Sequence, residues 1–239
     1  MKVVDTELLR RAAGQHAVVL RRQAMDLGMT SRQVQTRIGA GLIVPVHRGV
    51  YRMAGSVVSP EQDLRAACLA AGRGAVASHR GAAWLWSLRG FDNPAREITV
   101  RGGQPSLPGI VVHRSSSLGP VDVSRTRCVP VTTPARTIFD LGAVVEVEAV
   151  ECAMEDALLR RLVTFEVLSA AVRRLGGRGR PGSSVVRRLL AERDPAAAPT
   201  ESVLEDDLLR VLRRAGLPEP VRQHRVGGVR LDFAYPTVR

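Results

Sequence analysis

Two segments rich in glycine and proline constrain this chain most, because regular helices and strands rarely run through such composition. The first is residues 176–184, GGRGRPGSS, and the second is residues 193–199, RDPAAAP. A short helix, VVRRLLAE, is predicted between them. Both segments are typical of flexible joints. We therefore expect a linker over residues 176–199, and the 239 residues are enough for about two or three small domains around it.

The charge of the chain favours a polyanionic partner. The formal net charge is +12, which is most simply explained by binding to nucleic acid. Lys2 is the only lysine, so arginine supplies nearly all of the positive charge. Such a bias is also typical of a GC-rich genome, and both explanations stay open.

Cysteines and hydropathy narrow the class of protein. Cys68, Cys128 and Cys152 are far apart and form no C-x-x-C pair, which predicts reduced thiols rather than a disulfide framework or a cysteine zinc site. No apolar run approaches the ~20 residues that span a bilayer, and no signal peptide is recognisable. We expect a cytoplasmic protein with no membrane partner.

The first unit, residues 1–55, has the parts of a winged helix-turn-helix. Helices are predicted in TELLRRAAGQHAVV, where Gly14 ends the first helix, in RRQAMDLG and in SRQVQTRIGAG, and two short strands follow in LIVPVHRGVYRMAG. Thr30 is a good N-cap for the third helix, with Val34 and Ile38 on its buried face. Gly49 can supply the turn between the strands.

The exposed face of the third helix is polar, and the turn between the strands is basic. In winged-helix modules the third helix enters the major groove and the wing touches the DNA backbone. Small helix-turn-helix domains also bind proteins, so a protein contact stays the alternative. The expected DNA contacts are Thr30, Ser31, Arg32, Gln33, Gln35, Thr36 and Arg37 on the helix, and Arg48 at the turn.

Residues 57–175 predict a mixed α/β middle domain. Helices are expected in EQDLRAACLAAG and SHRGAAWLWSLRGF, strands in EITVRGG and GIVVHRSSS, and a further helix begins at Pro134 with Thr133 as its N-cap. Two more helices follow. The candidate active-site residues are scattered and show no nucleophile–base spacing, which favours a scaffold or protein-interaction domain. They are His79, Arg80, His113, Arg114, Arg136 and Asp140.

Residues 200–239 predict an amphipathic helix followed by a hairpin. The helix carries Glu205 and the second strand carries Asp232. A metal-dependent phosphodiesterase needs several carboxylates around a divalent ion. Glu205 and Asp232 are therefore candidate catalytic residues, and Asp232 is the candidate metal ligand. Both can equally be surface charges.

Residues 20–55, LRRQAMDLGMTSRQVQTRIGAGLIVPVHRGVYRMAG, resemble the N-terminal domain of AbiEi-type antitoxins. The S-H-R, V-H-R and P-V-T-T-P-A-R-T-I stretches of the middle domain resemble the core of the same family. That family pairs a winged-helix repressor domain with a domain that opposes a nucleotidyltransferase toxin. The resemblance implies double-stranded DNA and a nucleotidyltransferase-type toxin as partners.

Residues 200–239 resemble the start of the PD-(D/E)XK nuclease superfamily, in the branch similar to very-short-patch-repair endonucleases. In that family a strand with Glu-x-Asp or Glu-x-Lys follows the strand that carries the aspartate. No such strand follows Asp232. The resemblance therefore implies an incomplete nuclease-like domain, no cofactor for this chain, and Mg²⁺ only in a longer nuclease parent.

The expected fold class is α+β. An N-terminal winged helix-turn-helix (1–55) is followed by a mixed α/β middle domain (57–175), a linker with a short helix (176–199), and a truncated restriction-endonuclease-like αβ segment (200–239). The predicted function is a DNA-binding transcriptional regulator or antitoxin-like protein of a bacterial toxin–antitoxin or defence system, with a nuclease-like C-terminus that is expected to be inactive in this chain. The alternative is a PD-(D/E)XK endonuclease that a winged helix targets to DNA.

Overall fold

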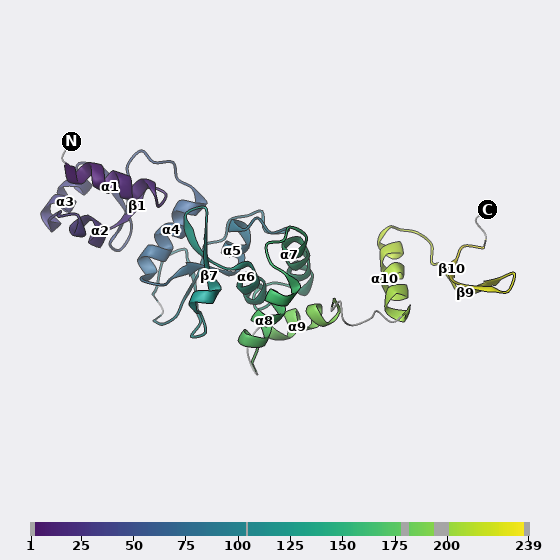
Figure 1. Ribbon diagram of the computed structural model, residues 1–239. Coiled ribbons are helices and arrows are strands. Elements are labelled where there is room, and N and C mark those ends of the chain that lie inside the picture. The colour runs from purple at the N-terminus through teal and green to yellow at the C-terminus, as the bar shows by residue number, and fades with distance from the viewer. Residues whose placement is uncertain (1–2, 104, 178–181, 194–200, 237–239) are drawn as a thin grey trace. The chain divides into compact units, whose positions relative to one another are not determined.

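The computed structural model describes residues 3–103, 105–177, 182–193 and 201–236 (Figure 1). The chain divides into two compact units, Met1–Leu190 and Ala191–Arg239. Within the described residues helices and strands are mixed, with ten α-helices and three separate sheets. The expected α+β class is confirmed. None of the described helices is both long enough and apolar enough to cross a membrane.

The first unit begins with three helices and a small sheet. The helices are α1 (Val3–Ala13), α2 (Arg21–Asp26) and α3 (Ser31–Gly39). The strands are β1 (Val18–Leu20), β2 (Ile43–His47) and β3 (Val50–Met53), in the antiparallel order β1-β3-β2. The sequence predicted β2 and β3, but no strand was expected at β1, which follows the first helix that Gly14 was expected to end. Val18 and Val19 are fully buried, which explains why this segment joins the sheet.

One apolar cluster holds these elements together. Leu8 and Ala12 of α1 pack with Val34 of α3 and Tyr51 of β3. Val34 is fully buried, as its spacing predicted, and Ile38 packs at the edge of the cluster. A second small cluster joins the sheet to the next helix, α4 (Pro60–Ala71), through Ala66.

A five-stranded mixed sheet follows, in the order β6-β5-β4-β8-β7. β4 pairs parallel with β8 and β5 pairs parallel with β6, whereas the other pairs are antiparallel. Between β4 and β5 the chain forms α5 (His79–Leu85), and a short 3₁₀ helix, η1 (Pro120–Asp122), precedes β7. The strands are β4 (Val76–Ala77), β5 (Glu97–Val100), β6 (Val111–Arg114), β7 (Val123–Thr126) and β8 (Val129–Thr132).

Four helices complete the first unit: α6 (Pro134–Leu141), α7 (Val147–Leu159), α8 (Phe165–Leu175) and α9 (Ser183–Ala191). Thr133 caps α6 by accepting a hydrogen bond from the Arg136 amide, and Pro134 is its first residue, both as predicted. The helices share the largest core cluster, which includes Ile138, Met154 and Leu168.

The helix predicted within the linker is present as α9, but it belongs to this core. Its Val186, Leu189 and Leu190 are buried with the residues of α6, α7 and α8. The preceding Gly182 has φ +82°, and a Cβ there would lie 2.8 Å from the Phe139 carbonyl oxygen and from the Ala143 nitrogen. A linker over the whole of 176–199 is therefore wrong, because glycine at 182 allows close backbone packing rather than freedom. Residues 178–181 and 194–199 of the expected linker lie outside the described residues.

The second unit contains α10 (Glu201–Arg214) and the strands β9 (Val221–Val226) and β10 (Val229–Ala234). The strands form an antiparallel hairpin around Gly227 and Gly228, which both have positive φ. Paired positive φ values are what a tight two-residue turn requires. The predicted order of a helix followed by a hairpin is confirmed.

Candidate functional site

The start of α3 is held by a reciprocal pair of hydrogen bonds. The Thr30 hydroxyl oxygen accepts from the Gln33 amide at 3.2 Å, and Gln33 Oε1 accepts from the Thr30 amide at 2.8 Å. This capping box confirms Thr30 as the N-cap. The capping box also occupies the side-chain oxygens of Thr30 and Gln33, which are both expected DNA contacts.

Arg37 has a structural environment. Its Nε lies 2.7 Å from Asp5 Oδ1, its Nη1 lies 3.0 Å from the Gln33 carbonyl oxygen, and its side chain is only 14% exposed. The ion pair joins α3 to α1. We therefore assign Arg37 to the packing of these helices, in place of the DNA contact expected from the sequence.

The other expected contacts lie on the exposed surface. Ser31, Arg32, Gln35 and Thr36 are exposed on α3, and Arg48 is exposed at the turn between β2 and β3. A groove of about 430 Å³ lies between α3 and this hairpin, so the two elements share one surface. It is lined by Gln35, Ile38, Pro45, Val46, His47, Arg48, Gly49 and Tyr51.

The structure describes the side chain of one of the two candidate carboxylates of the second unit. Asp232 is exposed on β10. The side chain of Glu205 lies outside what the structure describes. Within the described part of the chain, no group of three potential metal ligands includes Asp232.

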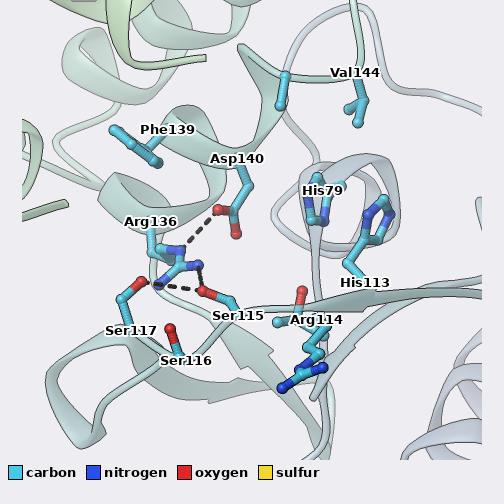
Figure 2. A pocket seen from close by; sticks show the side chains of 12 residues that line it. His79, His113, Arg114, Ser115, Ser116, Ser117, Arg136, Phe139, Asp140 and Val144 are labelled. Atoms are coloured by element: carbon cyan, nitrogen blue, oxygen red, sulfur yellow. Dashed lines mark hydrogen bonds and ion pairs between the residues drawn. The ribbon is translucent and has the colours of Figure 1, made fainter. Parts of the chain in front are cut away.

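A pocket of about 440 Å³ opens between the end of β6 and α6 (Figure 2). Five of the six residues that are scattered in the sequence line it, and Arg80 is the exception. The β5–β6 pairing places His113 opposite Thr99, and the Ser78 amide donates to the Glu97 carbonyl oxygen. Glu97 and Thr99 are two residues apart and share one face of β5, so His79 and His113 lie beside the same face. The lining residues are His79, Thr99, His113, Arg114, Ser115, Ser116, Ser117, Arg136, Phe139, Asp140, Ala143 and Val144.

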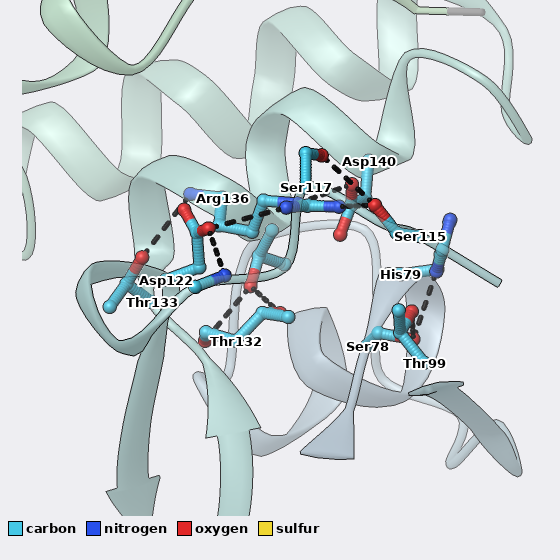
Figure 3. Close-up of polar contacts among 12 residues, drawn as sticks. Ser78, His79, Thr99, Ser115, Ser117, Asp122, Thr132, Thr133, Arg136 and Asp140 are labelled. Carbon is cyan, nitrogen blue, oxygen red and sulfur yellow. Dashed lines mark hydrogen bonds and ion pairs between the residues drawn. The ribbon is translucent and has the colours of Figure 1, made fainter. Parts of the chain in front are cut away.

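Arg136 is the hub of the polar network in this pocket (Figure 3). Its Nε donates to Asp140 Oδ1 at 2.8 Å and its Nη2 donates to Ser115 Oγ at 2.9 Å. A weaker contact of 3.4 Å joins its Nη1 to Asp122 Oδ2. Arg136 and Asp140 thus form an i,i+4 ion pair along α6, and both side chains are buried.

Asp140 leaves one acceptor without a donor. Its Oδ2 is buried and has no hydrogen-bond partner among the described residues. Burial raises the pKa of the Asp140 carboxyl to about 6, although Arg136 and His113 oppose the shift. An unmet buried acceptor costs about 1–3 kcal/mol, so such an atom in a pocket is typical of a site that receives a ligand or water.

Two histidines face each other beside Asp140. The rings of His79 and His113 are stacked, with centroids 3.6 Å apart and planes at 22°. His79 Nδ1 lies 2.9 Å from Ser78 Oγ, which accepts a hydrogen bond of 2.8 Å from Thr99. Burial, and then the nearby His113, lowers the pKa of His79 to about 3. The His79 ring is therefore uncharged at neutral pH.

Glu97 lies against this pair. Its carboxylate is almost fully buried, with Oε1 2.5 Å from Arg80 Nε and Oε2 3.4 Å from His113 Nε2. Burial opposes ionisation, but the hydrogen bonds from His113 and Arg80 outweigh it and lower the pKa of Glu97. Sequence analysis did not single out Glu97, because the β5–β6 pairing that brings it to the histidines leaves no periodic signal.

Comparisons with known proteins place few constraints on this chain. No family model matches it, and neither does any curated protein. One similar solved structure is the crystal structure of the RV2827C protein from Mycobacterium tuberculosis, with 14% sequence identity and a TM-score of 0.49. That match covers 80% of this chain and 77% of the other.

Proposed function

We propose that residues 1–55 form a winged helix-turn-helix that binds double-stranded DNA, and that the protein is a DNA-binding regulator. The observation that carries the proposal is the shared surface of α3 and the β2–β3 hairpin. Gln35 on α3 and Arg48 on the hairpin line one groove, and Ser31, Arg32 and Thr36 are exposed beside it.

The shape of this surface suits the major groove of DNA. An α-helix has a diameter of about 10–12 Å with its side chains, and the major groove is about 12 Å wide. Arg32 and Gln35 are residue types that pair with guanine and adenine edges. Arg48 is exposed at the turn of the β2–β3 hairpin, and in the proposed complex it contacts a phosphate, as wings do.

The buried contacts of α3 support the same interpretation. Thr30 and Gln33 fix the beginning of the helix, and Arg37 ties it to α1 through Asp5. The exposed polar residues thus lie on a helix whose opposite side is fixed to α1. A rigid presentation lowers the entropic cost of binding. The net charge of +12 adds a favourable electrostatic contribution with a polyanion.

An antitoxin-like role for residues 57–175 is the second part of the proposal, and it rests on the resemblance to AbiEi-type antitoxins. In this role the middle domain opposes a nucleotidyltransferase-type toxin while the winged helix represses their shared operon. Co-expression with such a toxin, encoded next to this chain, is expected to restore growth. Failure of rescue would leave DNA binding as the function.

DNA binding is tested directly with the purified full chain. Fluorescence anisotropy is measured with a duplex from its own promoter and with a random duplex, at several salt concentrations. We expect tighter binding to the promoter and a linear fall of log K with log salt, with a slope of about 0.9 for each phosphate contacted. Equal absence of binding to both duplexes at low salt would contradict the proposal.

A further inference from the structure

We propose that His79, Glu97 and His113 form a binding site for a divalent transition metal, with Zn²⁺ as the best fit. One coordination position of this metal opens into the pocket between the end of β6 and α6. Their ligand atoms lie within 4.8 Å of one another, and no other such group of three occurs in the part of the chain that the structure describes. Two imidazoles and one carboxylate are a ligand set that zinc sites with an open position use. The site is independent of the DNA-binding surface.

The separation of His113 and Glu97 fits this assignment. The distance between Nε2 and Oε2 is 3.4 Å, which is long for a hydrogen bond between nitrogen and oxygen. Two ligand atoms bound tetrahedrally at about 2.0–2.1 Å from one zinc ion are about 3.3–3.4 Å apart. The two side chains are therefore already spaced as neighbouring ligands.

The groups behind the ligands are also those that a metal site needs. Ser78 contacts one nitrogen of His79 and is itself held by Thr99. Arg80 holds the second oxygen of Glu97. Groups that hydrogen-bond to metal ligands in this way fix the orientation of the ligands and raise metal affinity. The charge of Arg80 is balanced by Glu97, and that of Arg136 by Asp140 and Asp122, so neither arginine adds an uncompensated charge beside the metal.

The backbone of His79 supports metal binding further. His79 has φ +50°, a conformation that costs energy in a residue with a side chain. Strain of this kind is concentrated at ligand-binding positions. Binding requires one ring to rotate out of the stack, because the two stacked rings do not aim at one point.

Asp140 lies where a water on the open coordination position of the metal would be bound. His79 and His113 line the same pocket as Asp140, and Figure 2 shows the Asp140 carboxylate on the side of the pocket that faces the histidines. A water on the fourth position of the metal would lie within this pocket. It would be a donor for the unpartnered Oδ2 of Asp140. One bound metal thus explains both the histidine pair and the unmet acceptor.

The test uses the full chain, stripped of metal with EDTA and dialysed. Zn²⁺ is titrated by calorimetry, bound metal is counted by elemental analysis, and Co²⁺ absorption reports the coordination geometry. We expect one metal per chain and a tetrahedral Co²⁺ spectrum. His113→Ala and Glu97→Gln are each expected to weaken Zn²⁺ binding by more than about 100-fold, since they remove a direct ligand.

His224→Ala is the matched control, because this histidine lies on β9 of the second unit and is expected to leave Zn²⁺ affinity unchanged. His113 is the decisive ligand position, since its side chain is 23% exposed and its replacement is the least disruptive to the core. Circular dichroism confirms that each variant is folded. Zn²⁺ binding that survives His113→Ala in a folded protein, or a six-coordinate Co²⁺ spectrum, would overturn the proposal.

Discussion

Arg174 on α8 forms an ion pair with the fully buried carboxylate of Asp122, 52 residues earlier in the chain. Asp122 also accepts from the Gly119 amide at 2.9 Å and contacts Arg136. It therefore connects the loop before β7 with α6 and α8. Burial by itself raises the pKa of the Asp122 carboxyl, but Arg174, the Gly119 amide and Arg136 outweigh it and hold the pKa below its usual value.

Replacing this carboxylate is expected to destabilise the first unit. Asp122→Asn leaves the buried charge of Arg136 with one partner fewer, and the free energy of unfolding should fall by about 3 kcal/mol at neutral pH. Because the folded pKa of Asp122 is lowered, its stabilisation is present above the unfolded pKa and is lost as the pH falls through the folded pKa. Urea unfolding of both proteins should therefore give a smaller difference at pH 3 than at pH 7.

Asp63→Asn is the control for this measurement. Asp63 pairs with Arg96 near the surface, and an exposed pair contributes about 0–1 kcal/mol. Equal destabilisation by the two substitutions would contradict the role given to Asp122.

Arg32 and Arg48 are expected to contribute differently to DNA binding. Arg32→Ala should weaken binding to the specific duplex by about 1–3 kcal/mol and relax its sequence preference, because in the proposed complex this residue reads a base. Arg48→Ala should weaken binding to all duplexes alike and reduce the salt slope by about 1, because in the proposed complex Arg48 neutralises a phosphate. Arg73→Ala, at an exposed position outside this surface, is the control in the same anisotropy titration.

Arg37→Ala is expected to lower stability rather than sequence preference. The substitution removes the buried side of the ion pair with Asp5, which should reduce the free energy of unfolding by about 1–3 kcal/mol. A double-mutant cycle with Asp5→Asn measures the coupling between the two residues. A loss of base discrimination with unchanged stability would instead make Arg37 a DNA contact.

Gly182→Ala tests whether α9 is part of the core. A Cβ at this position would lie 2.8 Å from backbone atoms of Phe139 and Ala143, and φ is +82°. We expect a loss of about 2–4 kcal/mol in the free energy of unfolding, from overpacking and backbone strain together. Gly177→Ala has no atom within 4 Å of the added Cβ and should change stability by less than about 1 kcal/mol.

The chain is expected not to cut DNA. Within the described residues Asp232 belongs to no group of three potential metal ligands. Metal-dependent attack on a phosphodiester needs several ligands around the divalent ion. Supercoiled plasmid incubated with the full chain and Mg²⁺ or Mn²⁺ should be nicked no faster than with Asp232→Ala. Metal-dependent nicking that disappears in that variant would establish the endonuclease alternative.

Local features of this fold could be predicted where a few neighbouring residues determine them. Thr30 and Gln33 lie three apart and form the capping box, and Thr133 with Pro134 begins α6, because both motifs act within one turn of helix. The hairpin of the second unit follows from Gly227 and Gly228 in the same way. These interactions depend on sequence distance alone.

The pocket between the end of β6 and α6 could not be predicted, because it depends on the order of the strands in the sheet. His79 and His113 meet through β4, β5 and β6, and parallel pairing of β5 with β6 has no periodic signature. The recurrence of His-Arg at 79–80 and at 113–114, beside two of these strands, was the available signal. Glu97 carried no signal, since a lone glutamate at a strand start is usually a surface charge.

The position of α9 also decides where this protein can be divided. A fragment that ends at residue 175 would lack Val186, Leu189 and Leu190, and the apolar faces of α6, α7 and α8 that they cover would be open to water. Such a fragment would tend to self-associate through that face. Cutting after α9 instead leaves the core closed, so the natural border for separate expression lies downstream of the glycine-rich segment that looks most like a domain boundary.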